Sequence, residues 1–362
     1  MRVKEPLYYN VSAYEYYMEL SVGTPPQDLL VVMDTGSSVV WAACTPTYTC
    51  TLDPYPCSGS ITVFLPNKSS SALPVQCADP KCREVCYEGT CPDKCSGTCP
   101  DYDLEYGSGS ANGHLLTDTL TLPSGSGHIT KFGFGCSVTS QGIAGIAGFG
   151  RGKLSLPSQL SVHKFAYCLN DQNNGSVIVL GDRAVPTNMS LNYTPFLNNS
   201  VGYNEYYYIG IQGVSIGGKY LRLPSTISKI DNYGNGGTII DSGTTLTSFP
   251  VAVVDQIKAE FSSQIRYPEV QPTDIFVLCY NVSGVAHIQF PKFSFHFSSG
   301  SVMVLPEGNC FMPQGNGTYC LAFSPSDMSR GPAAILGSYQ SRNLYILYDT
   351  EMNRLGFTRR AC

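Results

Sequence analysis

The chain has 362 residues, of which 43% are hydrophobic and only 14% are charged. That balance excludes an intrinsically disordered chain. The net charge of −5 leaves no basic surplus, so we expect no nucleic-acid partner. No apolar run is long enough to cross a bilayer, so we also expect no membrane association. The 36 glycines, 24 prolines and 24 tyrosines favour many short strands and turns.

Alternation of apolar and polar residues predicts strands in both halves of the chain. In chain order they cover residues 14–22, 176–180, 206–211, 292–297 and 343–348. Helical spacing is rare: residues 251–265, after Pro250, carry apolar side chains at a 3.6-type period, and 155–160 fit one short helix. The sequence therefore predicts an all-β protein with few short helices.

Two segments repeat one pattern, an apolar strand that ends in Asp, a small hydroxyl residue, Gly and another hydroxyl residue. The first copy contains Asp34 and the second contains Asp241, 207 positions later. Each copy is followed far downstream by two apolar residues and a glycine, at 146–148 and 335–337. A repeated pair of signals indicates a duplicated lobe.

The duplication predicts two lobes of similar length. The stretch 183–203 is rich in Asn and Pro and carries several sequons, as expected of a connection. We therefore expect an N-terminal lobe over residues 1–190 and a C-terminal lobe over residues 191–362.

The repeated aspartates suggest a specific chemistry. An Asp at the end of a buried strand is costly unless it is hydrogen-bonded. The glycine that follows can donate its N–H to the carboxylate, and the hydroxyl residues can hold the outer oxygens. If the two loops meet, like charges cannot both ionise easily, so the carboxylates share a proton. One carboxylate then acts as a base on water while the other polarises a carbonyl.

Cysteine usage indicates an oxidising compartment. Nine of the 15 cysteines lie between Cys44 and Cys99. Many are spaced by three or four residues and no histidine joins them, which argues against zinc and for disulfides. The odd count leaves at least one thiol unpaired within the chain. Cys362 could close a long loop or be that remaining thiol.

Glycosylation sequons agree with secretion. A single Asn-x-Ser/Thr means little, but eight beside a cysteine cluster favour an exported glycoprotein. The first five residues carry no hydrophobic signal core, so no signal peptide is visible. The candidate sites are Asn10, Asn67, Asn174, Asn188, Asn192, Asn198, Asn281 and Asn316.

Six segments in order carry a resemblance to a known family. They are VGTPPQ (22–27), MDTGSSVVW (33–41), EYGSGS (105–110), IAGFG (146–150), IDSGTT (240–245) and AILGS (334–338). The chain resembles the pepsin-type aspartic proteases (family A1). The segments 148–160 and 165–169 are similar to the plant nepenthesin-like branch. The resemblance implies a bilobal acid protease fold with two β-barrel-like lobes related by a pseudo-twofold axis.

The resemblance implies a role for each matching residue. Asp34 and Asp241 would form the catalytic dyad. The supporting residues would be Thr35 and Ser242, which would link the two loops, Ser37 and Thr244, which would bond the outer oxygens, and the glycines Gly36 and Gly243. The serine in the second Asp-Ser-Gly keeps the hydroxyl of the more usual threonine.

A flap is implied at 106–108, where Tyr106, Gly107 and Ser108 would close over substrate. Gly107 and Gly109 would give the flap mobility. Trp41, the only tryptophan, would hold the Tyr106 hydroxyl, although ordinary core packing would also explain it. By the same resemblance, a disulfide would join Cys279 to Cys320.

The nine clustered cysteines fall in the 64 residues that separate Trp41 from Tyr106. This placement resembles the nepenthesin-type insertion. It would either shape the substrate cleft or a partner site, or act as a staple against proteolysis and acid.

The implied function is an acid endopeptidase that acts on peptide and protein substrates and binds pepstatin-type inhibitors. It would need no metal or cofactor, work as a monomer, and reside in the apoplast and cell wall or in the vacuole. The alternative is a catalytically silent binding protein on the same fold, an inhibitor of microbial glycan-degrading enzymes. Retention of Asp34, Asp241 and Tyr106 favours the enzyme.

Overall fold

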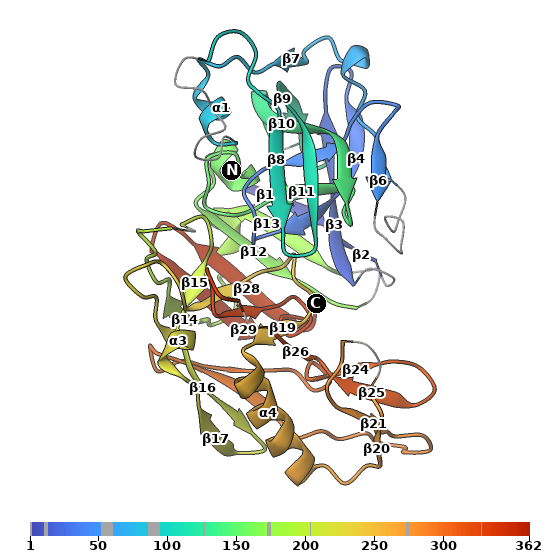
Figure 1. Ribbon diagram of the computed structural model, residues 1–362, viewed down its shortest axis with the longest axis vertical. Coiled ribbons are helices and arrows are strands. Elements are labelled where there is room, and N and C mark those ends of the chain that lie inside the picture. The colour runs from blue at the N-terminus through green and yellow to red at the C-terminus, as the bar shows by residue number, and fades with distance from the viewer. Residues whose placement is uncertain are drawn as a thin grey trace. The chain divides into compact units, whose positions relative to one another are not determined.

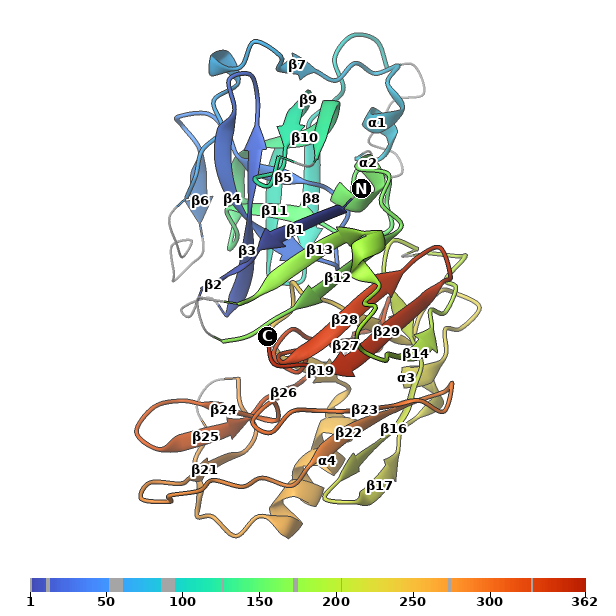
Figure 2. The same ribbon diagram turned by 180° about the vertical axis from the view of Figure 1, so that it is seen from behind.

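The computed structural model describes residues 2–10, 14–51, 61–85, 95–125, 127–171, 175–202, 204–272, 275–326 and 328–362. The chain forms two compact units. The first unit comprises Met1–Phe165 and Gln172–Ala184, and the second comprises Ala166–Asp171 and Val185–Cys362. Figures 1 and 2 show the strands and helices of both units from two sides.

A ten-stranded sheet dominates the first unit. Its order is β2-β3-β4-β11-β5-β10-β9-β7, with β6 on β10 and β8 on β9. The predicted strand 14–22 is confirmed as β3, in which every second side chain is buried. The strands are β2 (Tyr8–Asn10), β3 (Glu15–Val22), β4 (Gln27–Asp34), β5 (Trp41–Ala43), β6 (Thr49–Thr51), β7 (Leu73–Pro74), β8 (Tyr102–Tyr106), β9 (Gly109–Thr121), β10 (His128–Gln141) and β11 (Gly145–Gly148).

Shorter elements complete the first unit. β1 (Arg2–Pro6) pairs antiparallel with β13 (Val177–Gly181), the predicted strand at 176–180. Ser155 accepts a hydrogen bond from the Ser158 N–H and caps the predicted short helix. The remaining elements are α1 (Pro80–Arg83), α2 (Leu156–Gln159), η1 (Pro66–Lys68), η2 (Asp182–Ala184) and β12 (Lys164–Cys168), which extends into the second unit.

The second unit contains a five-stranded sheet and two four-stranded sheets. In sheet order these are β15 (Tyr208–Ile209), β18 (Thr238–Ile240), β27 (Ala334–Leu336), β19 (Thr247–Phe249) and β26 (Phe323–Pro325); β17 (Lys219–Arg222), β16 (Ile211–Ile216), β22 (Phe293–Phe297) and β23 (Val302–Val304); and β20 (Glu269–Val270), β21 (Cys279–Asn281), β25 (Thr318–Leu321) and β24 (Phe311–Pro313). β28 (Leu344–Asp349) pairs with β29 (Arg354–Arg359), which pairs with β14 (Asn192–Pro195). The unit also holds a four-residue helix, α3 (Ser225–Ser228).

The predicted helix at 251–265 is α4 (Val251–Gln264), and it lies against the strands of the second unit (Figure 1). Its Phe261 ring contacts Phe293 of β22 and Phe311 of β24. The neighbouring Glu260 is only 7% exposed and forms an ion pair with Lys219 at 2.5 Å. The all-β prediction with few short helices is confirmed.

We expect Glu260→Gln to lower stability near neutral pH but not in acid. Lys219 holds the pKa of Glu260 below its ordinary value. A lowered carboxyl pKa stabilises the fold above the unfolded-state pKa of about 4.3, and this stabilisation is lost as the pH falls through the folded pKa. Urea midpoints at about pH 6.5 and 2.5 test this, with the exposed Glu307→Gln as control. An equal loss at both pH values would contradict it.

The cysteines form disulfides within each unit. The pairs between described cysteines are Cys44–Cys136, Cys77–Cys95 and Cys82–Cys99 in the first unit, and Cys168–Cys362 and Cys279–Cys320 in the second. Cys50 is also disulfide-bonded. Cys362 thus closes a long loop, and Cys279–Cys320 is the pair that the resemblance implied. Among the described cysteines the free thiol is the buried Cys310. Cys57, Cys86 and Cys91 lie outside the described residues.

Seven of the eight sequon asparagines lie within the described residues, and Asn174 does not. Asn10 is half-buried, and the other six are exposed: Asn67, Asn188, Asn192, Asn198, Asn281 and Asn316. An attached glycan would therefore not displace core side chains at these six positions.

Candidate active site

The first aspartate loop holds its carboxylate on both oxygens. β4 ends at Asp34, which is 7% exposed. The Gly36 N–H donates to Asp34 Oδ1 at 2.8 Å, and the Ser37 hydroxyl donates to Oδ2. A carboxylate that accepts such bonds can stay at the end of a buried strand.

The second aspartate loop repeats this geometry with other residues. β18 leads into Asp241, which is 8% exposed. The Gly243 N–H donates to Asp241 Oδ1 at 2.8 Å, and the Thr244 hydroxyl donates to Oδ2 at 2.6 Å. The Ser37 and Thr244 hydroxyls therefore make equivalent hydrogen bonds, each to Oδ2 of the aspartate in its own unit.

The downstream glycines explain why each aspartate motif has a second signal. β11 runs parallel to β4, so that Gly148 lies beside Asp34. β27 runs parallel to β18, so that Gly337 occupies the position in the second unit that Gly148 occupies in the first. A Cβ on Gly148 would lie 2.6 Å from the Ser38 carbonyl carbon, and a Cβ on Gly337 would lie 2.6 Å from the Thr245 oxygen. Each aspartate loop crosses directly over its glycine.

Thr35 and Ser242 occupy equivalent buried positions, with exposed fractions of 0% and 2%. Both hydroxyl residues lie directly after their aspartates. Their proposed link between the two loops, and the shared proton of the two carboxylates, stay predictions.

The flap prediction corresponds to a β-hairpin. β8 and β9 pair antiparallel up to Tyr106 and Gly109, with Gly107 and Ser108 at the turn. The turn residues are exposed and Tyr106 is half-buried. Close packing, rather than mobility, requires a glycine at position 109, because a Cβ there would lie 2.0 Å from the Gln141 carbonyl oxygen.

Trp41 fits both readings that the sequence left open. Its side chain is fully buried in the core of the first unit. Its Nε1–H also donates to the Tyr106 hydroxyl at 2.7 Å. One residue therefore packs in the core and fixes the orientation of the flap tyrosine.

Ser38 is a supporting residue that the sequence reasoning did not assign. Its hydroxyl accepts from the Gly152 N–H at 3.0 Å, and the Gly150 N–H donates to the Ser37 carbonyl at 2.7 Å. These bonds attach the Gly-rich segment 148–153 to the Asp34 loop. The glycine-rich segment itself was the signal in the sequence, where it carries a resemblance to the nepenthesin-like branch.

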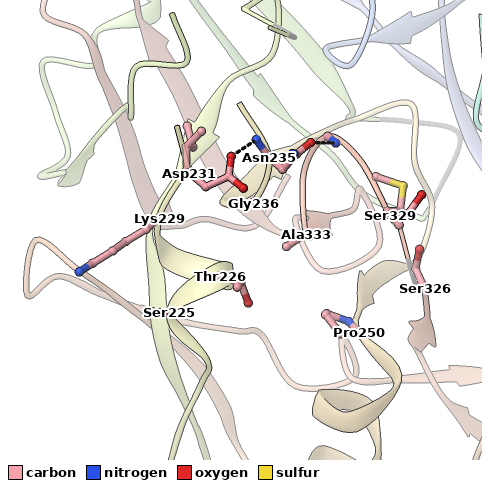
Figure 3. A pocket seen from close by; sticks show the side chains of 13 residues that line it. Ser225, Thr226, Lys229, Asp231, Asn235, Gly236, Pro250, Ser326, Ser329 and Ala333 are labelled. Carbon is pink, nitrogen blue, oxygen red and sulfur yellow. Dashed lines mark hydrogen bonds between the residues drawn. The ribbon is translucent and has the colours of Figure 1, made fainter. Parts of the chain in front are cut away.

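A cavity of about 660 Å³ lies in the second unit (Figure 3), and Asp241 is not among the residues that line it. Gly236 and Ala333 line it, and they precede β18 and β27, whereas Asp241 follows β18. At one side of it, the Asn235 N–H donates to Asp231 at 2.9 Å and holds the pKa of that carboxyl below its ordinary value. The cavity and the aspartate therefore occupy opposite ends of the same strands.

Within the described ranges, no three or more His, Cys, Asp or Glu residues gather in a way that could hold a metal ion. None of the helices in the described part of the chain has the length and apolar character needed to span a membrane.

Family models match both halves of the chain. Residues 16–182 match the model described as xylanase inhibitor N-terminal, and residues 206–359 match xylanase inhibitor C-terminal. The chain is 36% identical over 359 residues to aspartic proteinase nepenthesin-1 of Nepenthes gracilis, covering 96% of this chain and 78% of that protein. It is 32% identical over 366 residues to the protein Aspartic Protease in Guard Cell 2 of Arabidopsis thaliana, covering 96% and 73%.

Solved structures share the fold at lower identity. The crystal structure of edgp aligns with a TM-score of 0.78 at 21% identity, covering 99% of this chain and 95% of that chain. Basic 7S globulin from soybean aligns with a TM-score of 0.75 at 20% identity, covering 99% and 96%. These likenesses support the predicted fold class and carry no argument about activity.

Proposed function

Because the chain belongs to the nepenthesin-like branch of the pepsin-type aspartic proteases, we propose that it is an endopeptidase that hydrolyses peptide bonds at acidic pH. One observation carries the proposal. Both aspartate loops are complete, with a glycine N–H at 2.8 Å from one carboxylate oxygen and a hydroxyl donor on the other. Two aspartates, each with both oxygens held, are what an acid–base pair requires, and this completeness favours the enzyme over a binding protein.

In the proposed reaction, one carboxylate of Asp34 and Asp241 is ionised and the other is protonated. The ionised group takes a proton from a water as its oxygen attacks the scissile carbonyl carbon. The protonated group donates to the carbonyl oxygen, which gives a neutral tetrahedral diol. The roles then reverse: a proton passes to the leaving nitrogen as the C–N bond breaks. The Gly36 and Gly243 N–H groups hold the carboxylates in place throughout.

The substrate is an extended peptide or an unfolded protein segment. Tyr106 lies next to the turn of its hairpin, and its hydroxyl accepts a hydrogen bond from Trp41. From this position it can cover a bound peptide. Gly107 and Ser108 are exposed and can move with the turn. Pepstatin-type inhibitors that mimic the tetrahedral state bind the same machinery.

The site of action is an oxidising compartment. Five disulfides between described cysteines and six exposed sequon asparagines support secretion to the cell wall, or delivery to the vacuole, as a glycoprotein.

The alternative, a binding protein that inhibits glycan-degrading enzymes, draws support from the xylanase inhibitor description of both matching family models. It predicts a folded protein without peptidase activity. The two functions therefore separate in one assay.

The test is hydrolysis of an acid-denatured protein between about pH 2.5 and 7, with and without pepstatin. We expect activity that is highest in acid and that pepstatin abolishes. Folded, disulfide-intact protein without activity across this range would overturn the proposal and favour the binding function.

A further inference from the structure

The cysteine-rich insertion shares one hydrophobic core with the flap. Val75, Cys82, Val85 and Cys99 are each at most 6% exposed and belong to the same buried cluster as Trp41. Further members of that cluster come from the flap hairpin: Tyr102, Ala111 and Leu115, with the half-buried Leu104 and Tyr106 packed against it. Insertion residues therefore form part of the surface on which the flap rests.

The insertion is also bonded directly to the flap hairpin. The Val75 N–H donates to the Leu115 carbonyl of β9 at 3.0 Å, and β7 pairs with β9 at Thr117. The Cys99 N–H donates to the Val75 carbonyl at 2.8 Å, three residues before β8 begins at Tyr102. The disulfide Cys82–Cys99 then ties helix α1 to this point.

A third set of contacts reaches the Asp34 loop. Glu84, at the end of α1, pairs with Lys153 at 2.7 Å. The adjoining Leu154 is 2% exposed in the shared cluster, while Gly152 and Gly150 bond to Ser38 and Ser37. Segments 73–85 and 95–99, named the brace here, therefore contact both the flap and the support of the catalytic loop.

We propose that the brace is a positioning device for the flap: it holds β8 so that Tyr106 stays at its hydrogen bond to Trp41. This rests on the proposed function only for its catalytic consequence. β10 holds β9 on the side away from β8, whereas β8 pairs with β9 alone among the described strands. A strand paired on one side only depends on that one ladder and on the face it packs against. On β8 only Tyr102 is fully buried, and Leu104 and Tyr106 are half-buried. Leu104 and Tyr106 pack against the cluster to which the brace contributes, so the brace supports the end of β8 that carries Tyr106.

The single tryptophan gives a readout that does not depend on peptidase activity. Trp41 is buried at 0% exposure, so acrylamide quenches it poorly while the flap is held. Cys82→Ala/Cys99→Ala removes the staple, and Val85→Ala removes packing while leaving the staple. We expect the quenching constant to rise at least about twofold in both variants, because local opening exposes Trp41. Tyr106→Phe removes only the hydrogen bond to Trp41 and so measures the change in quenching that this loss alone causes.

The matched control is Cys279→Ala/Cys320→Ala, which removes a disulfide from the second unit. It should leave quenching of Trp41 unchanged. In the brace variants kcat/KM on a peptide substrate should fall about tenfold, with the wild-type pH profile retained because the aspartate loops are intact.

Unchanged quenching in folded brace variants would overturn the proposal, as would an equal change in the control. A wild type without peptidase activity would instead remove the proposed function, and the quenching comparison would still decide whether the brace holds the flap.

Discussion

Asp34→Asn and Asp241→Asn should each lower kcat/KM by about 10²–10⁴-fold, the loss expected when a general acid–base group is removed. The variants should still fold. An asparagine carbonyl accepts from the Gly36 or Gly243 N–H as the carboxylate does. The Ser37 and Thr244 hydroxyls can rotate to accept from the new amide. Only the ability to take and return a proton is lost.

Asp231→Asn is the matched control. This aspartate also accepts backbone N–H groups, from Tyr233 and Asn235 at 2.8 and 2.9 Å, but it lines the cavity at the other end of β18. It should retain activity within about threefold. Peptide hydrolysis at acid pH gives kcat/KM, and circular dichroism reports the fold. Either dyad variant within tenfold of the wild type would mean that its carboxylate is not the acid–base group.

The sequence predicted the aspartate loops well because their chemistry is local. Gly36 bonds Asp34 two residues away and Ser37 bonds it three residues away, so the motif contains the whole cradle. The strand at 14–22 and the helix at 251–265 could be predicted equally well. Both bury one face, so their apolar residues recur at a regular spacing in the sequence.

Long-range contacts were less accessible. The segment 206–211 reads as one alternating strand, but the structure divides it into β15 and β16, which belong to different sheets. Periodicity cannot reveal a change of partner sheet. Likewise, the spacing of the cysteines does not predict that Cys310 is the free thiol among the described ones. Disulfide pairing depends on which side chains meet after folding.

The brace was hidden for a related reason. Val75 and Val85 are isolated valines in a cysteine-rich stretch, without a helical or strand period. Their burial depends on Trp41 and Tyr102, which come from distant segments. The sequence left open whether the insertion shapes the cleft or acts as a staple. The Cys82–Cys99 disulfide lies in the core against which Tyr106 packs, and both roles stay predictions.

Gly148→Ala and Gly337→Ala should both destabilise their units strongly. In each case the added Cβ would lie 2.6 Å from backbone atoms of an aspartate loop, not from a flexible side chain. Overpacking of this kind typically costs about 1–3 kcal/mol, and more where backbone must shift. Any shift moves the Asp34 loop or the Asp241 loop, so peptidase activity should fall together with stability.

Gly202→Ala is the control, since its Cβ would meet no atom within 4 Å. Chemical denaturation compares the midpoints of the three variants, and the expected order places Gly202→Ala closest to the wild type. The two motif glycines come from separate units but make the same crossing, so they should behave alike. If only one proved sensitive, the downstream glycine would be a local packing feature of that unit. The repeated signal that linked Asp34 to 146–148 and Asp241 to 335–337 would then need a different physical cause in each half.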